Sequence, residues 1–222
     1  MAHTSNQIDQ AVLDGVLDAC SSLLTPHPEM DTAINNALHT IGSAADVDRA
    51  YIFQVRRDRD GTDRAYHRYE WTAPDIAPEI ENPALQGIPL VEAGYGRWLA
   101  SFRQFRPVFG SITSFPPEEH ATLEAQSILS LVVLPIHINS SLWGFVGFDE
   151  CTNQREWDES SIDLLIAISL ALGIALDTEN KPGDFDGSVK TYLRLVEQFS
   201  QTGNQKNKPQ DNTSANSEPV TT

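Results

Sequence analysis

The sequence predicts a mixed α/β (α+β) domain, and two features of its second half carry that prediction. Two apolar runs, Leu131–Ile138 and Leu142–Phe148, flank a three-residue polar connection, which is typical of a β-hairpin. A long aliphatic helix follows, Ser160–Leu176, with Asp158 or Ser160 as its N-cap. Strands and helices are therefore both expected in this chain.

The first part of the chain predicts two helices and two strands. Apolar residues recur at three- and four-residue intervals over residues 6–24, which indicates a helix with one buried face. The segment Thr25–Pro28 contains two prolines and ends that helix, and a second helix is expected over Glu29–Ala44. Two strands, Arg49–Arg56 and Arg64–Thr72, are then joined by a polar turn.

The middle of the chain predicts shorter elements. Ala73–Pro89 contains four prolines and is expected to be a long irregular connection. A short helix around Gly94–Phe105 and a short strand near Pro107–Ile112 should follow. Another helix should begin at Pro116–Glu119, because prolines and acids suit the unpaired donors and the positive dipole at a helix start.

With 222 residues, the chain is long enough for one domain with appendages. We expect that domain over residues 28–178, after an N-terminal amphipathic helix within residues 1–27. A linker and a last amphipathic helix are expected over residues 179–201. Residues 202–222 are polar and without periodicity, which predicts a disordered tail.

The charge is strongly negative and unevenly distributed. A net charge of −16 argues against nucleic-acid binding, because phosphates would be repelled. Residues 1–48 contain no Lys or Arg, whereas nine of the fifteen basic residues lie between Arg49 and Arg106. This basic section either pairs internally with the acidic flanks or forms an anion-facing surface or pocket mouth.

The sequence gives no sign of a signal peptide. The most apolar stretch, Ser160–Leu176, is interrupted by Asp163, so no membrane span is expected. Two cysteines, Cys20 and Cys151, are too few for a disulfide framework or a four-ligand zinc site. We therefore expect a cytoplasmic protein without a bound metal.

Four short phrases resemble a bacterial subgroup of GAF domains that is common in sensor kinases: Asp48–Phe53 (DRAYIF), Glu70–Pro74 (EWTAP), Phe115–Glu119 (FPPEE) and Trp143–Asp149 (WGFVGFD). The resemblance covers roughly residues 28–178. It implies a central antiparallel sheet of five to six strands, with the terminal helices on one face and a roof of loop and short helices on the other. It also implies a stand-alone sensory or regulatory module, and no kinase, nucleophile–base or phosphate-loop motif is visible that would make the chain an enzyme.

A small-molecule cavity in this fold would be lined by aromatic side chains and a few polar groups. The candidates come from one strand and from the short helix of the roof: His67, Tyr69, Trp71, Trp98, Phe102 and Phe105. The alternative is that these rings only fill the core.

Cofactors and catalysis are the competing classes of function. Bilin-binding GAF domains hold a tetrapyrrole through a cysteine in the roof, a position that neither Cys20 nor Cys151 matches. A strand histidine, His67 or His137, is a conceivable haem or metal ligand but is more often a hydrogen-bonded structural residue. The free-methionine sulfoxide reductases of this fold use several cysteines. We expect neither bilin nor haem, although a chromophore or haem sensor and a redox enzyme remain the alternatives.

The long helix also predicts assembly, because Ser160–Leu176 is apolar nearly all round and one sheet face covers only part of a helix. A parallel homodimer is expected, with Ile8, Val12, Val16 and Leu23 of the first helix at its seam. A partner such as a kinase or a response regulator would then detect changes in helix packing. Alternatively, the first and last helices cover the long helix within one chain.

Overall fold

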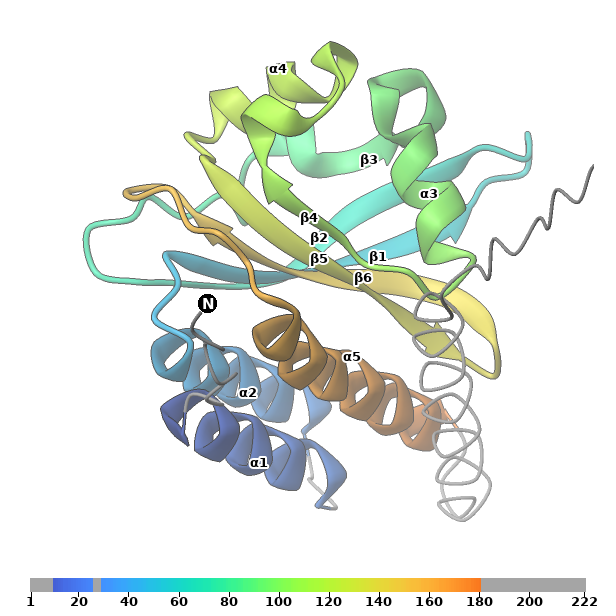
Figure 1. Cartoon of the computed structure of the whole chain (residues 1–222). Coiled ribbons are helices and arrows are strands. Elements are labelled where there is room, and N and C mark those ends of the chain that lie inside the picture. Colours follow the sequence, from blue (N-terminus) through green and yellow to red (C-terminus); the bar gives the residue numbers. More distant parts are fainter. Residues whose placement is uncertain (1–9, 26–28, 181–222) are drawn as a thin grey trace, which may run out of the picture.

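The computed structural model describes residues 10–25 and 29–180 of the chain. A six-stranded sheet, in which every neighbouring pair is antiparallel, separates two layers of helices (Figure 1). The sheet order is β3-β2-β1-β6-β5-β4. The strands are β1 (Arg49–Arg57), β2 (Asp63–Thr72), β3 (Gln86–Pro89), β4 (Val108–Ser111), β5 (Ser130–Ile138) and β6 (Ser141–Glu150). The predicted fold class is confirmed.

Three long helices lie on one face of the sheet and two shorter ones on the other (Figure 1). The helical layer contains α1 (Gln10–Leu24), α2 (Met30–Ala44) and α5 (Glu159–Asn180). The roof contains α3 (Gly96–Phe102), α4 (Pro117–Ala125) and the short turns η1 (Pro83–Leu85), η2 (Val91–Tyr95) and η3 (Ile112–Ser114). The predicted helix within residues 179–201 and the predicted disordered tail lie outside the described residues, apart from the end of α5.

The hairpin between β5 and β6 is tighter than the sequence pattern predicts. Ser141 already pairs with Ile138, so the connection has two residues, Asn139 and Ser140. Both have a positive φ, 50° and 64°, as a type I′ turn requires. The twist of that turn matches the twist of the strands, which is why it is favoured over longer connections here.

Helix α5 begins where the sequence predicts. The Asp158 carboxylate accepts a hydrogen bond from the Ser161 backbone N–H at 3.0 Å, so Asp158 is the N-cap. Among the described residues, α5 is long and apolar enough to cross a membrane. However, 56% of its apolar window is buried within this protein. Ile168 and Leu172 are fully buried in the core of the helical layer. Core packing therefore accounts for its apolar character.

Helix α1 covers α5 and α2 within the same chain. Its residues Val12, Val16 and Leu23 are buried in the core of the helical layer. Gly15 allows a close approach, because a Cβ at that position would overlap Ala44 at the end of α2. The prediction that these three residues form a dimer seam is therefore wrong, since the neighbouring helices already bury them. The fourth predicted seam residue, Ile8, lies outside the described residues.

The long connection after β2 is ordered and contains a strand that the sequence pattern did not predict. β3 pairs with β2 at three positions at the edge of the sheet. The loop before it is held by the Glu70 carboxylate, which accepts hydrogen bonds from the backbone N–H groups of Glu79 and Ile80 at 2.8 Å each. This anchoring places the loop beside the roof.

The sheet has a different core on each face. The core of the helical layer is mainly aliphatic, with fully buried residues such as Ile34, Leu134 and Leu165. The roof-side core is rich in rings: Tyr51, Phe53, Tyr95, Trp98, Phe102, Phe115 and Phe145. A candidate site lies among the rings.

Candidate functional site

A cavity lies between the sheet and the roof, with apolar walls and polar groups at one end. Its sheet side is formed by β1, β2 and β6, and its roof side by η2, α3 and α4: Arg49, Tyr51, Phe53, Ala65, His67, Leu85, Ile88, Leu90, Tyr95, Trp98, Thr122, Leu123, Gln126, Ile128 and Phe145. The part of the cavity in which the centre of a water molecule fits has a volume of about 50 Å³. All atom-free space out to the open mouth amounts to about 530 Å³. The smaller value is the one to compare with enclosed cavities, and it holds a few water molecules.

The cavity wall contains His67 but neither Tyr69 nor Trp71. A β-bulge interrupts the pairing of β1 with β2, because Ile52 pairs with Tyr69 while Phe53 pairs with His67. One extra residue reverses the side-chain alternation, so Tyr69 and Trp71 point to the helical layer, where they pack against its core. The sequence prediction that both line a ligand pocket is therefore corrected.

The three predicted roof candidates lie in different environments. Trp98 lines the cavity. Phe102 is fully buried beside it, with ring contacts to Trp98 and Phe145, and so supports the wall without forming it. Phe105 stacks on His137 with ring centroids 3.9 Å apart, away from the cavity wall. Among the predicted pocket residues, the structure brings His67 and Trp98 together at the cavity.

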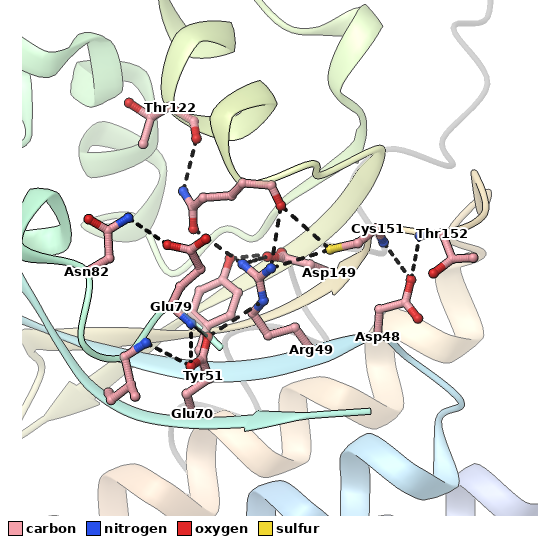
Figure 2. Close-up of polar contacts among 12 residues, drawn as sticks. Asp48, Arg49, Tyr51, Glu70, Glu79, Asn82, Thr122, Asp149, Cys151 and Thr152 are labelled. Carbon is pink, nitrogen blue, oxygen red and sulfur yellow. Dashed lines mark hydrogen bonds and ion pairs between the residues drawn. The ribbon is translucent and has the colours of Figure 1, made fainter. Parts of the chain in front are cut away.

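The polar end of the cavity is built around Arg49, which is 3% exposed. Figure 2 shows its guanidinium between the carboxylates of Glu70 and Asp149. The shortest separations are 3.6 Å from Arg49 Nε to Glu70 and 3.9 Å from Nη1 to Asp149. Its hydrogen bonds to Gln126 are also long, at 3.4 Å. Strong charge-assisted bonds are about 2.7–2.9 Å, so this buried charge is loosely held by its neighbours.

Asp149 lies behind Arg49 and is fully buried. It accepts a hydrogen bond from the Tyr51 hydroxyl at 3.0 Å, while its second oxygen makes none within the described residues. Burial raises the pKa of Asp149 to about 7, although Arg49 and the Tyr51 hydrogen bond act in the opposite direction. Burial also raises the pKa of Glu70. The polar end therefore resists further negative charge.

The two ring nitrogens of His67 are buried close to the backbone of Tyr69 and Glu79. Within the described residues, neither ring nitrogen makes a hydrogen bond of good geometry, and the residue is only 4% exposed. Burial lowers the pKa of His67 to about 4, and the nearby backbone of Glu79 and Tyr69 opposes this only in part. The ring is therefore neutral near pH 7, with one donor and one acceptor nitrogen. Buried polar atoms of this kind normally have a partner.

The roof is fixed by a buried carboxylate. Glu119 of α4 accepts two hydrogen bonds from Arg97, at 2.9 and 2.7 Å, and one from Trp98 Nε1 at 2.7 Å. Gly94 brings η2 against α4, because a Cβ there would crowd the backbone of Glu118. These contacts hold Trp98 over the cavity.

The sequence reasoning missed the polar end, whose members are Arg49, Asp149 and Gln126. Two signals pointed in its direction. Arg49 opens the basic middle section that was expected to pair internally or to face an anion, and it also lies within the DRAYIF phrase. Arg49 pairs with Asp149 across the β1–β6 ladder. The two residues are 100 positions apart in the sequence, so no local pattern reveals the pair.

The described residues offer little chemistry of other kinds. No group of three or more His, Cys, Asp or Glu side chains that would hold a metal ion is present among them. Burial raises the pKa of Cys20 to about 11 and that of Cys151 to about 12. Reactive thiols have lowered pKa values, so neither cysteine has the environment of a nucleophile.

Comparisons with known proteins agree with this architecture. The chain is 34% identical over 155 residues to the methanogenesis regulatory histidine kinase FilI of Methanothrix harundinacea (strain 6Ac). That match covers 70% of this chain but only 17% of the relative, so the chain spans a small part of that kinase.

Similar solved structures include light-sensing domains. One is the far-red absorbing dark state of a protein with bound biliverdin IXa, with a TM-score of 0.61, 18% identity, and coverage of 75% of this chain and 98% of that one. Another is the blue-light absorbing form of the Thermosynechococcus elongatus PixJ GAF domain, with a TM-score of 0.55, 14% identity, and coverage of 86% and 95%. At these identities the likeness concerns the fold alone.

The family model for the GAF domain matches residues 29–176, which include every strand of the sheet and both helices of the roof. GAF domains occur in sensory and regulatory proteins, and the relative described above is a regulatory histidine kinase. This chain belongs to the GAF domain family.

Proposed function

We propose that this domain is a non-catalytic sensory module that binds a small organic molecule in the roof-side cavity. The observation that carries this proposal is the cavity itself, whose walls are mostly aromatic and apolar and whose lining includes two buried polar residues, Arg49 and His67. A largely apolar cavity with a few polar residues in its lining is the usual form of a small-molecule site in proteins.

We propose that this domain does not hold a covalently attached tetrapyrrole. The chain has only two cysteines, on α1 and just after β6, and neither lies in the roof where bilin-binding domains attach the chromophore. We therefore expect no bilin in this domain. The absorbance of the purified protein at about 350–750 nm tests bilin and haem together.

A thiol-dependent reductase is the competing class of function. Its support would be the shared scaffold, but Cys20 and Cys151 lie on different elements, and burial raises the pKa of both thiols. Thiol-dependent reduction of free methionine sulfoxide by the purified protein would favour the reductase. Lack of turnover, together with ligand binding, supports the sensory module.

We further propose a cytoplasmic homodimer as the signalling unit, with a seam on the outward face of α1. The structure excludes the inward residues, but Leu17 is 59% exposed and Leu13 is half-buried on the outward side. Ligand-driven changes in the roof would reach a partner kinase or response regulator through the sheet and this helical layer. Light scattering of the wild type and of Leu17→Glu tests the seam, since a monomeric wild type contradicts it.

Native mass spectrometry of the protein as purified is the direct test of the proposed function. A retained molecule should appear as added mass under gentle conditions and disappear on denaturation. The matched control is Leu123→Trp, which fills the cavity from α4 and should remove the added mass while the fold is kept. Retained mass in this variant would place the ligand elsewhere and contradict the proposed site.

A further inference from the structure

The polar side chains around the cavity turn their polar atoms into the protein. The Tyr51 hydroxyl donates a hydrogen bond to the buried Asp149 carboxylate at 3.0 Å (Figure 2). The indole N–H of Trp98 donates to the buried Glu119 carboxylate at 2.7 Å. Both donor hydrogens are therefore used within the protein, and these two residues present ring surface to the cavity.

The polar groups on the α4 side of the cavity also pair with one another. The Arg49 Nη1 and Nη2 atoms donate to the side-chain and backbone oxygens of Gln126, at 3.4 Å each. The Gln126 side-chain amide donates in turn to the backbone carbonyl of Thr122 at 3.0 Å. The Thr122 side chain is a hydrogen-bond partner of Tyr95. A molecule in the cavity therefore meets polar groups that already have partners.

The remaining wall consists of rings and aliphatic chains. The rings of His67, Phe53 and Phe145 stack in a row across three strands, with centroids 4.6 and 5.2 Å apart. Both ring nitrogens of His67 are enclosed by protein atoms, so this residue also contributes ring surface. Trp98 and Leu123 close the cavity from the roof. The surface that a ligand would contact is therefore apolar.

The enclosed space is larger than a gap between packed side chains. The centre of one water molecule needs about 10–15 Å³ of such space, and the cavity has about 50 Å³. A buried water molecule also needs roughly two to four polar partners, and a lining whose polar groups are already paired supplies few of them. An apolar molecule needs no such partner, and it gains free energy when it leaves water for apolar walls.

We infer that the cavity selects a small, uncharged and apolar molecule, of the class of a single hydrocarbon ring, through contact with its aromatic and aliphatic walls. This inference rests on the proposed function and names the class of ligand for the same site. Selectivity follows from desolvation, because a polar or charged group carried into the cavity would lose its water and find no free partner. An apolar ring needs only contact with the walls.

Three probes built on one benzene ring test this selectivity: toluene, phenol and benzoate. Phenol has nearly the shape of toluene, with a hydroxyl group in place of the methyl group, and benzoate carries a negative charge. Titration of the wild-type protein at about pH 7, followed by calorimetry or ligand-detected NMR, should show toluene binding at least tenfold more tightly than phenol. Benzoate should bind more weakly still. A smaller preference for toluene, or tighter binding of either polar probe, overturns the inference.

Two leucines provide a matched pair of variants. Leu123→Trp fills the cavity from α4 and should abolish toluene binding. Leu129→Trp makes the same change at a leucine that is 38% exposed and outside the cavity lining, and it should leave binding unchanged. Toluene binding that persists in a folded Leu123→Trp protein lies elsewhere and overturns the inference.

A third variant tests whether a polar group of the lining takes part in binding. Tyr51→Phe removes the hydroxyl that donates to Asp149, and the affinities for toluene and phenol should both stay unchanged. A selective loss of phenol affinity would show that this hydroxyl pairs with the ligand, which overturns the inference. Thermal unfolding of each variant reports on its fold. The order of the three probes on the wild-type protein decides the inference even if Tyr51→Phe does not fold.

The outcomes separate the inference from the proposed function. If toluene does not bind but native mass spectrometry finds a polar or charged molecule that Leu123→Trp removes, the inference fails and the proposed function stands. If toluene does not bind and the protein carries no added mass, both fail. If toluene binds in the expected order and Leu123→Trp abolishes its binding, both are supported.

Discussion

The two faces of the sheet are built by the same strands but have different chemistry. On the helical face, aliphatic side chains from α1, α2, α5 and the sheet are closely packed. On the roof face, aromatic rings surround a cavity, and a buried arginine lies between two carboxylates at distances too long for strong hydrogen bonds. Of the residues with unpartnered buried polar atoms in the described part, Trp157 alone packs in the helical-face core.

This difference separates stability from function within one sheet. Close aliphatic packing gains free energy from burial and from dispersion contacts, and it needs no partner. The roof face gives up part of that gain, because its polar groups are desolvated without full compensation. Sites of this kind are where proteins bind ligands, so the less completely packed face is the one that we propose as the binding face.

A charge placed in the core of the helical face should strongly destabilise the folded protein. Val16→Glu introduces a carboxylate among the buried residues of α1, and we expect loss of the folded state or a loss of at least several kcal/mol. Ser21→Glu is the control, since it places the same carboxylate on the same helix at an exposed position and should be tolerated. Circular dichroism during urea unfolding measures both. A stable Val16→Glu protein would mean that α1 is not part of the core.

Truncating a buried side chain should lower the free energy of unfolding more on the helical face than at the cavity. Ile168→Ala removes a fully buried side chain from α5 and should lose about 2–5 kcal/mol, near the upper end of that range. Leu123→Ala removes a side chain that already borders empty space, so fewer contacts disappear and the loss should lie near the lower end. Chemical unfolding of both variants compares them, and equal losses would contradict the difference between the faces.

The pH dependence of stability should reflect Asp149. Its pKa is raised to about 7 in the folded state, so its contribution to stability is fully present below the unfolded value near 3.8 and is lost as pH rises through 7. Asp149→Asn cannot ionise, so its stability relative to wild type should improve between pH 4 and pH 8, by on the order of 1–4 kcal/mol. Thermal unfolding at a series of pH values measures this, and a constant difference would show that Asp149 does not titrate there.

The same pH range contains two opposing contributions. Burial lowers the pKa of His67 and of His137 to about 4, so each favours the folded state increasingly as pH rises from about 4 to 6.5. The wild-type curve therefore combines both directions, and only the difference between Asp149→Asn and wild type isolates the carboxylate.

The smallest effect is expected at the hairpin, far from either core. Ser140 has a φ of 64° in the two-residue turn, a conformation that glycine adopts without strain. Ser140→Gly should therefore stabilise the protein slightly, by about 0.5 kcal/mol, because Asn-Gly is the preferred pair for a type I′ turn. A matched change at the turn's partner, Asn139→Gly, should gain less, since it removes the hydrogen bond to Asp177. Destabilisation by Ser140→Gly would contradict the turn type.

Local patterns in the sequence predicted the elements well where the physics is local. The alternation of apolar residues gave the β5–β6 hairpin, and Asp158 marked the start of α5. The pattern failed at β3, which is short, pairs at three positions and contains Gly87 and Pro89, both unfavourable in a strand.

By itself, the sequence determined the class of the fold and the amounts of apolar and aromatic surface that had to be buried. The tertiary structure decided which face each residue occupies. One bulge beside Ile52 turned Tyr69 and Trp71 away from the cavity while His67 stayed in it, because a single inserted residue reverses a period of two. Folding also brought Arg49 and Asp149 together and covered α5 with α1. These are contacts between distant residues, and no local pattern encodes them.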